Sequence, residues 1–533
     1  MVSRKQLVLM LAVAPVFAQP RFYEDDPLTR DPMPRTVKEL ATRKIDDVYS
    51  FFENSYVTPR REGREARHDP QRALDVNTLG EVADSAWYTN RHAFRHMSMA
   101  ELERGPGKST PPSPSDSWKI VGAKSDGVTP GFIIEDRNGG RYMLKLDPPQ
   151  YPELCSASDV IGSKFFYALG YNTPENYIVF FRRENLFIAA DVQYRDPDGR
   201  KRPLTEHMLS ELLSGQRKTV DGKYRALASR WIGGEVVGPF AYRGVRTDDP
   251  NDIVPHEDRR MLRGLAVFSA WLNHHDTRSI NTMDTLVQEN GRRYIKHYLI
   301  DFGSILGSAG YAPKEPWIGH RYVIDHRATA KDLMTLGVIP PRYARADYPK
   351  LTGVGLFDSE SFEPLSWRPF YPNPAFVMMD DADAFWAAKQ VAAFTDEEIR
   401  AIVRTGKYSD ARAEAWVADS LIERRKKLIA AWFSRVLPLD RFRVEDGRLG
   451  FDDLSAQYGV AAARTYKVAW SVYDNTRQKS APIAGASGVA LPHPPAGTEY
   501  LAATVSCGDG CSKQVVVYLK CSGGGFRVVG IDR

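Results

Sequence analysis

Two polar segments in the second half of the chain contain the residue types that metal-assisted phosphoryl transfer requires. The first is His274-His-Asp-Thr-Arg-Ser-Ile-Asn281, and the second, twenty residues later, is Asp301-Phe-Gly303. Such a transfer needs metal ligands, a cation on the phosphates and a carboxylate that orients the attacking hydroxyl group. Asp276 is the candidate for that carboxylate. Asn281 and Asp301 offer the oxygen ligands that Mg²⁺ or Mn²⁺ prefers.

Two basic residues are candidates for contact with phosphate groups. Arg278 follows Asp276 by two positions, where its guanidinium group can neutralise charge on the transferred phosphoryl group. Lys145 lies in the apolar segment Arg141–Leu146, which is typical of a strand. A lysine that points from a strand into a cleft can bind the α- and β-phosphates of a nucleotide. Taken alone, Lys145 is better explained as an exposed strand lysine, so its assignment depends on the other residues.

The segment after this strand offers an acidic partner for Lys145. Residues 156–170 have an apolar helical face, and Gly170 can end the helix. We place Asp159 in the first helical turn, where it can pair with Lys145 or simply cap the helix.

A glycine-containing segment lies between the first two predicted strands. It includes Gly127 and Gly131, whose backbone amides can cradle a phosphate group. The spacing of these glycines does not give the pattern G-x-G-x-x-G, so the signal is weak.

Strands and helices in a definite order must position these side chains. The sequence predicts strands at 118–121, 131–134, 141–146, 282–287 and 294–300, and a helix at 258–272. We expect an N-terminal extension and linker at 19–117, including a helix at 37–52. A domain at 118–437 follows, strand-rich to about 250 and helical afterwards, and then a small β-rich domain at 440–533.

The order of these motifs resembles that of atypical protein kinases. A strand lysine, a helix acid, Asp-x-x-x-x-Asn and Asp-Phe-Gly follow one another, as in HipA-type and CotH-type bacterial kinases and in the secreted kinases of animal secretory pathways. The chain looks most similar to uncharacterised exported bacterial proteins that share a helix of the form AxxIGSKFFYALGYNxPENYIV after the lysine strand. The resemblance covers roughly residues 80–435.

This resemblance implies an α+β, two-lobed kinase-like fold that uses ATP or another nucleotide with Mg²⁺ or Mn²⁺. Lys145 would then bind phosphates and pair with Asp159, Asp276 would be the catalytic aspartate, and Asn281 and Asp301 would hold the metal. The chain departs from the family pattern at Asp159, because the helix acid is usually a glutamate. We therefore expect a longer ion pair with Lys145, or a shift of the two lobes.

Composition fits a soluble globular protein of two or three domains. The chain has 533 residues, of which 43% are hydrophobic and 26% charged, with a formal net charge of +5. The charges are dispersed rather than gathered in a basic stripe, so no nucleic-acid partner is expected.

The N-terminus predicts export, and export would permit disulfides. Residues 1–18 combine a short basic start, an apolar run and a small residue at Ala18, as in a cleaved signal peptide; an uncleaved anchor is the alternative. No later stretch is apolar enough to span a membrane, so we expect a secreted or periplasmic chain without a transmembrane segment. Cys155 is expected to be a free, buried thiol. Three cysteines near the C-terminus, Cys507, Cys511 and Cys521, can form a disulfide whose pairing the sequence leaves open.

Two other classes of function remain open. The chain can be a nucleotide-binding pseudokinase, or an adhesion or binding module without turnover, because ATP is scarce outside the cytoplasm. It can also be a metal-dependent hydrolase that uses His274, His275 and Asp276 as ligands, although no H-E-x-x-H pair supports this. For a phosphotransferase the acceptor can be a protein, a glycan or a small molecule, and nucleotidyl transfer is a further possibility.

Overall fold

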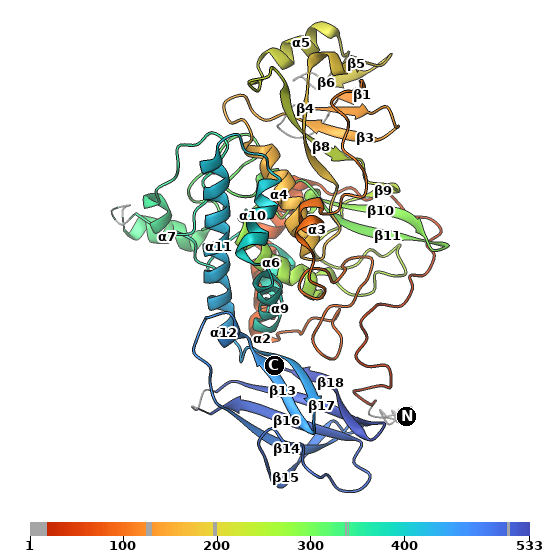
Figure 1. Ribbon diagram of the computed structural model, residues 1–533, viewed down its shortest axis with the longest axis vertical. Coiled ribbons are helices and arrows are strands. Elements are labelled where there is room, and N and C mark those ends of the chain that lie inside the picture. Colours follow the sequence, from red (N-terminus) through yellow and green to blue (C-terminus); the bar gives the residue numbers. More distant parts are fainter. Residues whose placement is uncertain (1–18, 124–130, 196–199, 336–337, 339, 509–511) are drawn as a thin grey trace, which may run out of the picture.

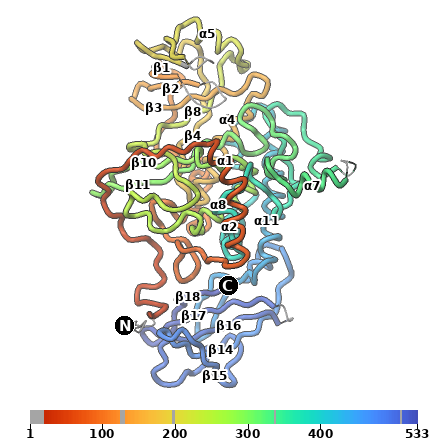
Figure 2. The backbone as a smooth tube through the Cα atoms, turned by 180° about the vertical axis from the view of Figure 1, so that it is seen from behind, coloured from red at the N-terminus to blue at the C-terminus, as the bar shows by residue number. Residues whose placement is uncertain are grey.

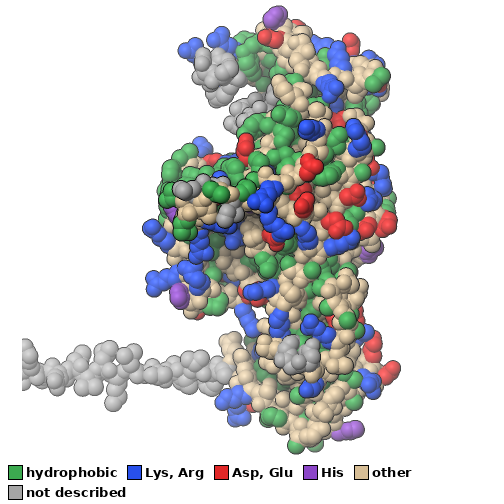
Figure 3. All heavy atoms as spheres, turned by 90° about the vertical axis from the view of Figure 1, so that its left-hand side faces the viewer, with side chains coloured by type: hydrophobic (Ala, Val, Ile, Leu, Met, Phe, Trp, Pro, Cys, Tyr) green, Lys and Arg blue, Asp and Glu red, His purple; other side chains and the backbone are tan. Residues whose placement is uncertain are grey.

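The computed structural model describes residues 19–123, 131–195, 200–335, 338, 340–508 and 512–533. The chain is elongated, with a strand-rich region at one end, a helix-rich region in the middle and a second strand-rich region at the other end (Figure 1). Gly127 lies outside the described residues. On the face drawn in Figure 3, basic and acidic side chains are interspersed over the whole molecule. Among the described residues, no helix is both long and apolar enough to cross a membrane.

A six-stranded mixed sheet forms the first strand-rich region. Its strand order is β4-β8-β3-β2-β1-β5, and only the β1–β5 pair is parallel. The strands of this region, including the separate β6–β7 hairpin, are β1 (Trp118–Ala123), β2 (Gly131–Glu135), β3 (Arg141–Lys145), β4 (Asn176–Phe181), β5 (Leu186–Ile188), β6 (Gln193–Arg195), β7 (Lys201–Pro203) and β8 (Tyr224–Arg230).

Alternation along β3 decides which way Lys145 points. Tyr142 and Leu144 are buried in the core between the sheet and helix α5 (Glu206–Ser214). Because successive side chains of a strand point to opposite faces, Lys145 lies on the other face of the sheet. Helix α4 (Leu154–Ala168) packs on that face through Val160, and nearly all of its residues are buried.

The N-terminal segment runs along the back of the molecule, from the C-terminal sheet past β10 and β11 to α1 (Figure 2). The predicted helix at 37–52 is wrong for its first part, because residues 36–46 form no helix. Val37 instead packs against the β9–β11 sheet, and Asp46 caps α1 by accepting a hydrogen bond from Tyr49 N at 2.9 Å. The helices are α1 (Asp47–Phe52), which continues through a π-helical turn (Glu53–Val57) into α2 (Thr58–His68), and α3 (Met99–Arg104).

The middle region surrounds a large hydrophobic core to which α4, α6, α9, α10 and α11 contribute. It also contains an antiparallel three-stranded sheet with the order β11-β10-β9. Its elements are β9 (Glu235–Gly238), α6 (Arg260–Leu272), β10 (Thr282–Glu289), β11 (Arg292–Leu299), α7 (His326–Met334), α8 (Pro374–Met378), α9 (Asp381–Ala392), α10 (Asp396–Arg404) and α11 (Ala411–Phe433). Short 3₁₀ turns cover Arg183–Asn185, His256–Asp258, Ser279–Asn281, Phe302–Ser304 and Arg342–Arg345.

The C-terminal region is an antiparallel five-stranded sheet, with the order β15-β14-β16-β17-β18, and a two-stranded hairpin. Phe22, from the N-terminal segment, packs among Tyr473, Tyr500 and Tyr518 of this sheet. Cys507 is disulfide-bonded, whereas Cys155 and Cys521 are free, which excludes Cys521 from the disulfide; Cys511 lies outside the described residues. The elements are β12 (Leu439–Glu445), β13 (Arg448–Asp453), α12 (Leu454–Gln457), β14 (Tyr466–Asp474), β15 (Lys479–Ser487), β16 (Tyr500–Cys507), β17 (Gln514–Ser522) and β18 (Gly525–Asp532).

Candidate active site

Lys145 is the centre of a cluster of charged side chains. Its Nζ lies 3.1 Å from Oδ2 of Asp159 and 3.0 Å from Oδ1 of Asp301. The three residues come from strand β3, helix α4 and the segment after β11, which are far apart in the sequence. The ion pair between Lys145 and Asp159 that the sequence predicts is present, and it is not lengthened by the shorter aspartate side chain.

Asp159 does not cap its helix, so that alternative is wrong. Helix α4 begins at Leu154, which places Asp159 in the second turn with only 2% of its side chain exposed. Its Oδ1 accepts hydrogen bonds from Asn176 Nδ2 at 2.9 Å and from Phe302 N at 3.1 Å. The buried carboxylate is therefore fully engaged between the sheet, the helix and the segment that follows Asp301.

Burial and charge act in opposite directions in this cluster. Burial raises the pKa of Asp159, and the neighbouring Lys145 opposes this effect. For Lys145, burial alone would lower the pKa, but the carboxylates of Asp159 and Asp301 outweigh burial and raise it. The two carboxylates therefore favour the charged form of Lys145, and 14% of its side chain is exposed, so an anionic ligand can reach it.

A hairpin explains why the chain segments that carry Asn281 and Asp301 lie side by side although the two residues are twenty positions apart in sequence. Strands β10 and β11 pair in register from Thr282–Leu299 to Glu289–Arg292, and the turn between them is Asn290-Gly291, with φ of 51° and 72°. The residues just before β10 and just after β11 therefore lie opposite each other. Ile300 N donates a hydrogen bond of 3.0 Å to the Asn281 carbonyl oxygen.

Phe302 connects the Asp301 segment to helix α4. Its ring is fully buried and stacks on Phe166, with centroids 5.0 Å apart. Gly162 makes this contact possible, because a Cβ atom there would lie only 2.6 Å from the Phe302 Cβ. The His274 ring completes the contact at a centroid distance of 6.0 Å from Phe302. Packing around one phenylalanine thus fixes the helix, the Asp301 segment and the start of the loop that carries Asp276.

Two buried basic side chains hold the C-terminal end of helix α6, from which this loop departs. Arg424 donates to the carbonyl oxygens of Ala270 at 2.6 Å and Trp271 at 2.8 Å, and Lys314 donates to that of Asn273. Asn273 ends the helix in the left-handed conformation, with φ of 51°. The last carbonyl groups of α6 are therefore satisfied, and the chain turns sharply into the Asp276 loop.

Within the loop, Asp276 is held by its neighbours. Arg278 Nη2 donates to Asp276 Oδ2 at 3.1 Å, and Arg278 Nε donates to Oδ1. Asn281 Nδ2 donates to the main-chain carbonyl oxygen of Asp276 at 2.8 Å. Burial alone would lower the pKa of Arg278, but its contacts with Asp276 outweigh burial and raise it. Arg278 also donates to Asp47 of the N-terminal segment at 2.6 Å, a partner that the sequence does not indicate.

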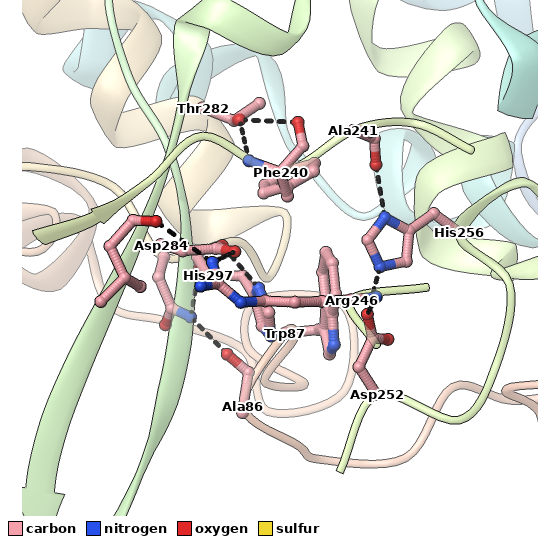
Figure 4. Close-up of polar contacts among 12 residues, drawn as sticks. Ala86, Trp87, Phe240, Ala241, Arg246, Asp252, His256, Thr282, Asp284 and His297 are labelled. Carbon is pink, nitrogen blue, oxygen red and sulfur yellow. Dashed lines mark hydrogen bonds and ion pairs between the residues drawn. The ribbon is translucent and has the colours of Figure 1, made fainter. Parts of the chain in front are cut away.

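A buried polar network anchors the hairpin that carries these residues (Figure 4). His297 Nδ1 lies 2.7 Å from Asp284 Oδ1, and the His297 ring stacks on Trp87 with centroids 3.4 Å apart. Thr282, the residue after Asn281, accepts a hydrogen bond of 2.9 Å from Phe240 N. These contacts fix the first residues of β10 and thereby the position of Asn281.

The two oxygen ligands proposed from the sequence fit a hard divalent cation. Asp301 has a left-handed backbone, with φ of 60°, and its side chain is 51% exposed. Asn281 uses its amide N–H for a hydrogen bond, so the amide oxygen is the atom it can offer to a metal. Carboxylate and amide oxygens are suitable ligands for Mg²⁺ or Mn²⁺.

Neither histidine of the loop belongs to a group of three side chains that could share a metal ion within the described part of the chain. Both rings are buried, and burial lowers the pKa of His274 to about 4 and the pKa of His275 well below its usual value. Three side chains that could share a metal ion, His92, His96 and Glu398, lie elsewhere. There Met97 N donates to His92 Nδ1 at 3.3 Å, which assigns the proton to Nε2. A metal-bound histidine normally donates through its other ring nitrogen, so this cluster is better explained by hydrogen bonding to Glu398.

Sequence reasoning places Gly131 near Lys145 but misses several supporting residues. Gly131 is the first residue of β2 and pairs directly with Lys145 in the sheet. Asn176, Lys314, Arg424 and Asp47 were not identified. Their local sequence does not mark them, because their partners lie far away in the chain.

Comparisons with known proteins give distant structural matches only. No protein-family model matches the chain, and no curated protein matches it. The chain is similar to the Helicobacter pylori proinflammatory kinase CtkA, with 12% identity, a TM-score of 0.33 and coverage of 59% of this chain and 98% of that chain. It is also similar to the golgi casein kinase, with 8% identity, a TM-score of 0.29 and coverage of 76% of this chain and 96% of that chain. Likeness at this level does not define an activity.

Proposed function

We propose that the chain is a two-lobed, kinase-like phosphotransferase that moves a phosphoryl group from a nucleotide to an acceptor hydroxyl group. The observation that carries the proposal is the meeting of Lys145, Asp159 and Asp301 in one ion-pair cluster, at 3.1 and 3.0 Å. The Asn281 carbonyl oxygen accepts a hydrogen bond from Ile300 N, and Ile300 directly precedes Asp301. This hydrogen bond joins the Asp276 loop, which ends at Asn281, to the Asp301 segment. A cation, two metal ligands and a carboxylate are the parts that phosphoryl transfer needs.

Each residue takes one role. Lys145 binds the phosphates of the donor nucleotide, and Asp159 holds Lys145 in place. Asn281 and Asp301 hold Mg²⁺ or Mn²⁺, which supplies positive charge to the phosphates when it is bound. Asp276 orients the acceptor hydroxyl group and accepts its proton, while the bond from the γ-phosphorus to the new oxygen forms and the bond to the nucleoside diphosphate breaks. Arg278 neutralises charge near Asp276. Gly131 begins the strand that pairs with β3, beside the proposed phosphate site.

We also propose that the mature chain is exported after cleavage behind Ala18. Cys507 is disulfide-bonded, and disulfides persist mainly in oxidising compartments. Arg21 binds Asp532 at 2.6 Å, so a chain that starts at residue 19 keeps its N-terminal contacts with the C-terminal sheet. Expression in a bacterial host followed by mass spectrometry of the periplasmic fraction tests this. We expect Gln19 as the first residue, and an intact N-terminus in the membrane fraction would contradict cleavage.

Nucleotide binding is the first test of the phosphotransferase. Melting temperatures are measured with ATP, GTP, CTP and UTP, each with Mg²⁺ or Mn²⁺, for the wild type, Asp301→Asn and Asp446→Asn. Asp446 is a matched control, because it is exposed, also left-handed with φ of 49°, and lies in the remote C-terminal hairpin. A ligand that binds only the native state stabilises it, so we expect a shift in the wild type and in Asp446→Asn that Asp301→Asn loses.

Turnover separates the remaining classes of function. Nucleotide labelled at the γ-phosphate reports phosphoryl transfer to the chain itself or to added proteins and glycans, and label at the α-phosphate reports nucleotidyl transfer. Binding without transfer of either label indicates a pseudokinase. Absence of any nucleotide shift contradicts the proposal and favours a binding module. Retention of zinc that His274→Gln abolishes would instead favour the hydrolase.

A further inference from the structure

The N-terminal extension reaches the Asp276 loop at one side chain. Asp47, the first residue of α1, accepts a hydrogen bond from Arg278 Nη1 through its Oδ2 at 2.6 Å. The other donors of this guanidinium group, Nε and Nη2, bind the two carboxylate oxygens of Asp276. Arg278 therefore lies between a carboxylate of the proposed active site and a carboxylate from a segment more than 200 residues earlier (278 − 47 = 231).

The backbone before α1 is fixed, so the position of Asp47 is fixed as well. Arg43 N donates to the Val237 carbonyl oxygen of β9 at 2.9 Å. Gly238 permits this approach, because its φ is 98° and a Cβ atom there would lie 2.0 Å from the Arg43 carbonyl oxygen. The buried Arg246 side chain joins the same segment to β9, donating to the carbonyl oxygens of Ala41 and of Val237, the latter at 3.1 Å. Figure 4 shows Arg246 within the network that also holds the β10–β11 hairpin.

Helix α1 also packs against the loop through its inner face. The Phe51 ring makes an edge contact with Tyr371 at a centroid distance of 5.8 Å. The neighbouring Phe370 N donates to the His275 carbonyl oxygen at 2.9 Å, one residue before Asp276. Two independent contacts, one polar through Asp47 and one aromatic through Phe51, therefore place α1 beside the Asp276 loop.

The partial exposure of Arg278, Asp47 and Asp276 indicates that their contacts position side chains rather than stabilise the fold. The side chains of Arg278 and Asp47 are 25% and 38% exposed, and that of Asp276 is 18% exposed. Ion pairs at such partly exposed positions contribute little to the stability of a fold. A planar guanidinium group bound on two sides is, however, restricted to one orientation, and that orientation decides where the Asp276 oxygens point.

We propose that Asp47 is a positioning residue that holds Arg278 against Asp276, so that the N-terminal extension completes the acceptor side of the active site. This inference rests on the proposed phosphotransferase activity. Without Asp47, one edge of the Arg278 guanidinium group has no carboxylate partner, and Arg278 can turn away from Asp276. The acceptor hydroxyl group is then oriented less often, whereas the nucleotide contacts at Lys145 stay unchanged.

The test compares Asp47→Asn with Asp46→Asn in the full chain. Asp46 is a matched control, because it loses the same charge from the same helix end, asparagine caps as well as aspartate, and no contact joins it to Arg278 in the described structure. We expect Asp47→Asn to lower kcat for nucleotide turnover about tenfold with an unchanged KM for the nucleotide, since positioning residues act on orientation. Asp46→Asn should change kcat less than about twofold.

A double-mutant cycle shows whether Asp47 acts through Arg278. In Arg278→Gln, the additional change Asp47→Asn should have no further effect on kcat, because the interaction is already lost. Equal kcat values for Asp47→Asn and Asp46→Asn, or additive losses in the cycle, would overturn the proposal.

Hydrogen exchange tests the position of Asp47 without relying on turnover. If the wild type shows no turnover, that result counts against the proposed function alone, and the role of Asp47 can still be tested. Amide protection of residues 273–281 should fall in Asp47→Asn and remain at the wild-type level in Asp46→Asn. Equal protection in the two variants would refute the role of Asp47, whatever the activity.

Discussion

At the Lys145 end of the candidate site, formed by Lys145, Asp159 and Asp301, the Asp159 side chain is buried, whereas Lys145 is 14% and Asp301 51% exposed. At the Arg278 end, formed by Asp276, Arg278 and Asp47, all three are partly exposed. The Lys145 end is built from elements that also form the core of the fold. The Arg278 end depends on a helix supplied by the N-terminal extension.

This difference fits the roles that we propose for the two ends. The proposed contacts with the phosphates of the donor come from packed elements, β3 and α4. The proposed acceptor site has to admit a second substrate, so the groups that would orient it must remain accessible. We therefore expect changes at the Lys145 end to affect stability and nucleotide affinity together, and changes at the Arg278 end to affect turnover with little effect on stability.

The largest effect is expected from Asp276→Asn. Loss of the group that accepts the hydroxyl proton should lower turnover about 10²- to 10⁴-fold. The free energy of unfolding should change by less than about 1 kcal/mol, because the pair with Arg278 is partly exposed. Steady-state kinetics and urea unfolding measure the two quantities, with Asp446→Asn as the control. If Asp276→Asn also lost nucleotide affinity, the expected difference between the Lys145 end and the Arg278 end would be contradicted.

Asp159→Asn should show the opposite pattern. The substitution leaves Lys145 with Asp301 as its only carboxylate partner in the cluster and weakens a buried ion pair, so we expect a loss of about 3 kcal/mol in the free energy of unfolding. Nucleotide affinity should fall as well, because Lys145 is no longer held in position. Urea unfolding followed by tryptophan fluorescence and nucleotide titration test this. A stability like that of Asp276→Asn would show that the buried Asp159 does not contribute to the fold as this account requires.

Gly162→Ala tests the packing that joins helix α4 to the Asp301 segment. The added methyl group would lie 2.6 Å from the Phe302 Cβ, so helix and segment must separate. Overpacking of this kind costs about 1–3 kcal/mol, and the melting temperature should fall accordingly. Gly139→Ala is the control. It adds the same methyl group at a turn where an added Cβ meets nothing within 4 Å, although the φ of 76° at Gly139 adds strain of its own. Equal melting temperatures for wild type and Gly162→Ala would show that this contact is not tight.

The smallest effect is a pH dependence from His274, which lies between the two ends. Burial lowers its pKa to about 4, whereas the unfolded chain has an ordinary histidine pKa near 6.5. Between about pH 4 and pH 6.5, His274 therefore binds a proton in the unfolded state but not in the native state. The resulting stability is fully present above about pH 6.5 and is lost as pH falls toward 4, by about 2 kcal/mol between pH 7.5 and 5.0.

Unfolding at both pH values for His274→Gln and for the exposed His207→Gln measures this contribution. The difference in unfolding free energy between pH 7.5 and 5.0 should shrink in His274→Gln and persist in His207→Gln. An unchanged pH dependence in His274→Gln would show that His274 does not report on the buried contact with Phe302.

Much of the Lys145 end could be predicted from the sequence, because the patterns that predict its elements lie within short segments of the chain. The apolar alternation around Lys145 predicts its strand, and the Asn290-Gly291 turn explains how twenty residues can return the chain from Asn281 to Asp301. The start of helix α4 could not be predicted, because its N-cap residue, Glu153, has a φ of 72° and makes no side-chain cap. Asp159 was therefore placed one turn too early.

The Arg278 end shows what local patterns cannot reveal. The helix predicted at 37–52 begins ten residues later, because Val37 is used to cover the β9–β11 sheet instead of a helical face. The contact between Asp47 and Arg278 joins residues that are 231 positions apart in the sequence, and neither side chain is unusual for its local sequence. The role of Gly127 stays a prediction, because this residue lies outside the described part of the chain.

Binding of Mn²⁺ in the presence of ATP, followed by electron paramagnetic resonance, tests the central claim most directly. The signal of free Mn²⁺ is titrated with the wild type, Asp301→Asn and Asp47→Asn. If Asn281 and Asp301 hold the metal beside Lys145, the wild type and Asp47→Asn bind the Mn²⁺–ATP complex equally, and Asp301→Asn binds it much more weakly. Equal affinity of Asp301→Asn and the wild type would contradict the account.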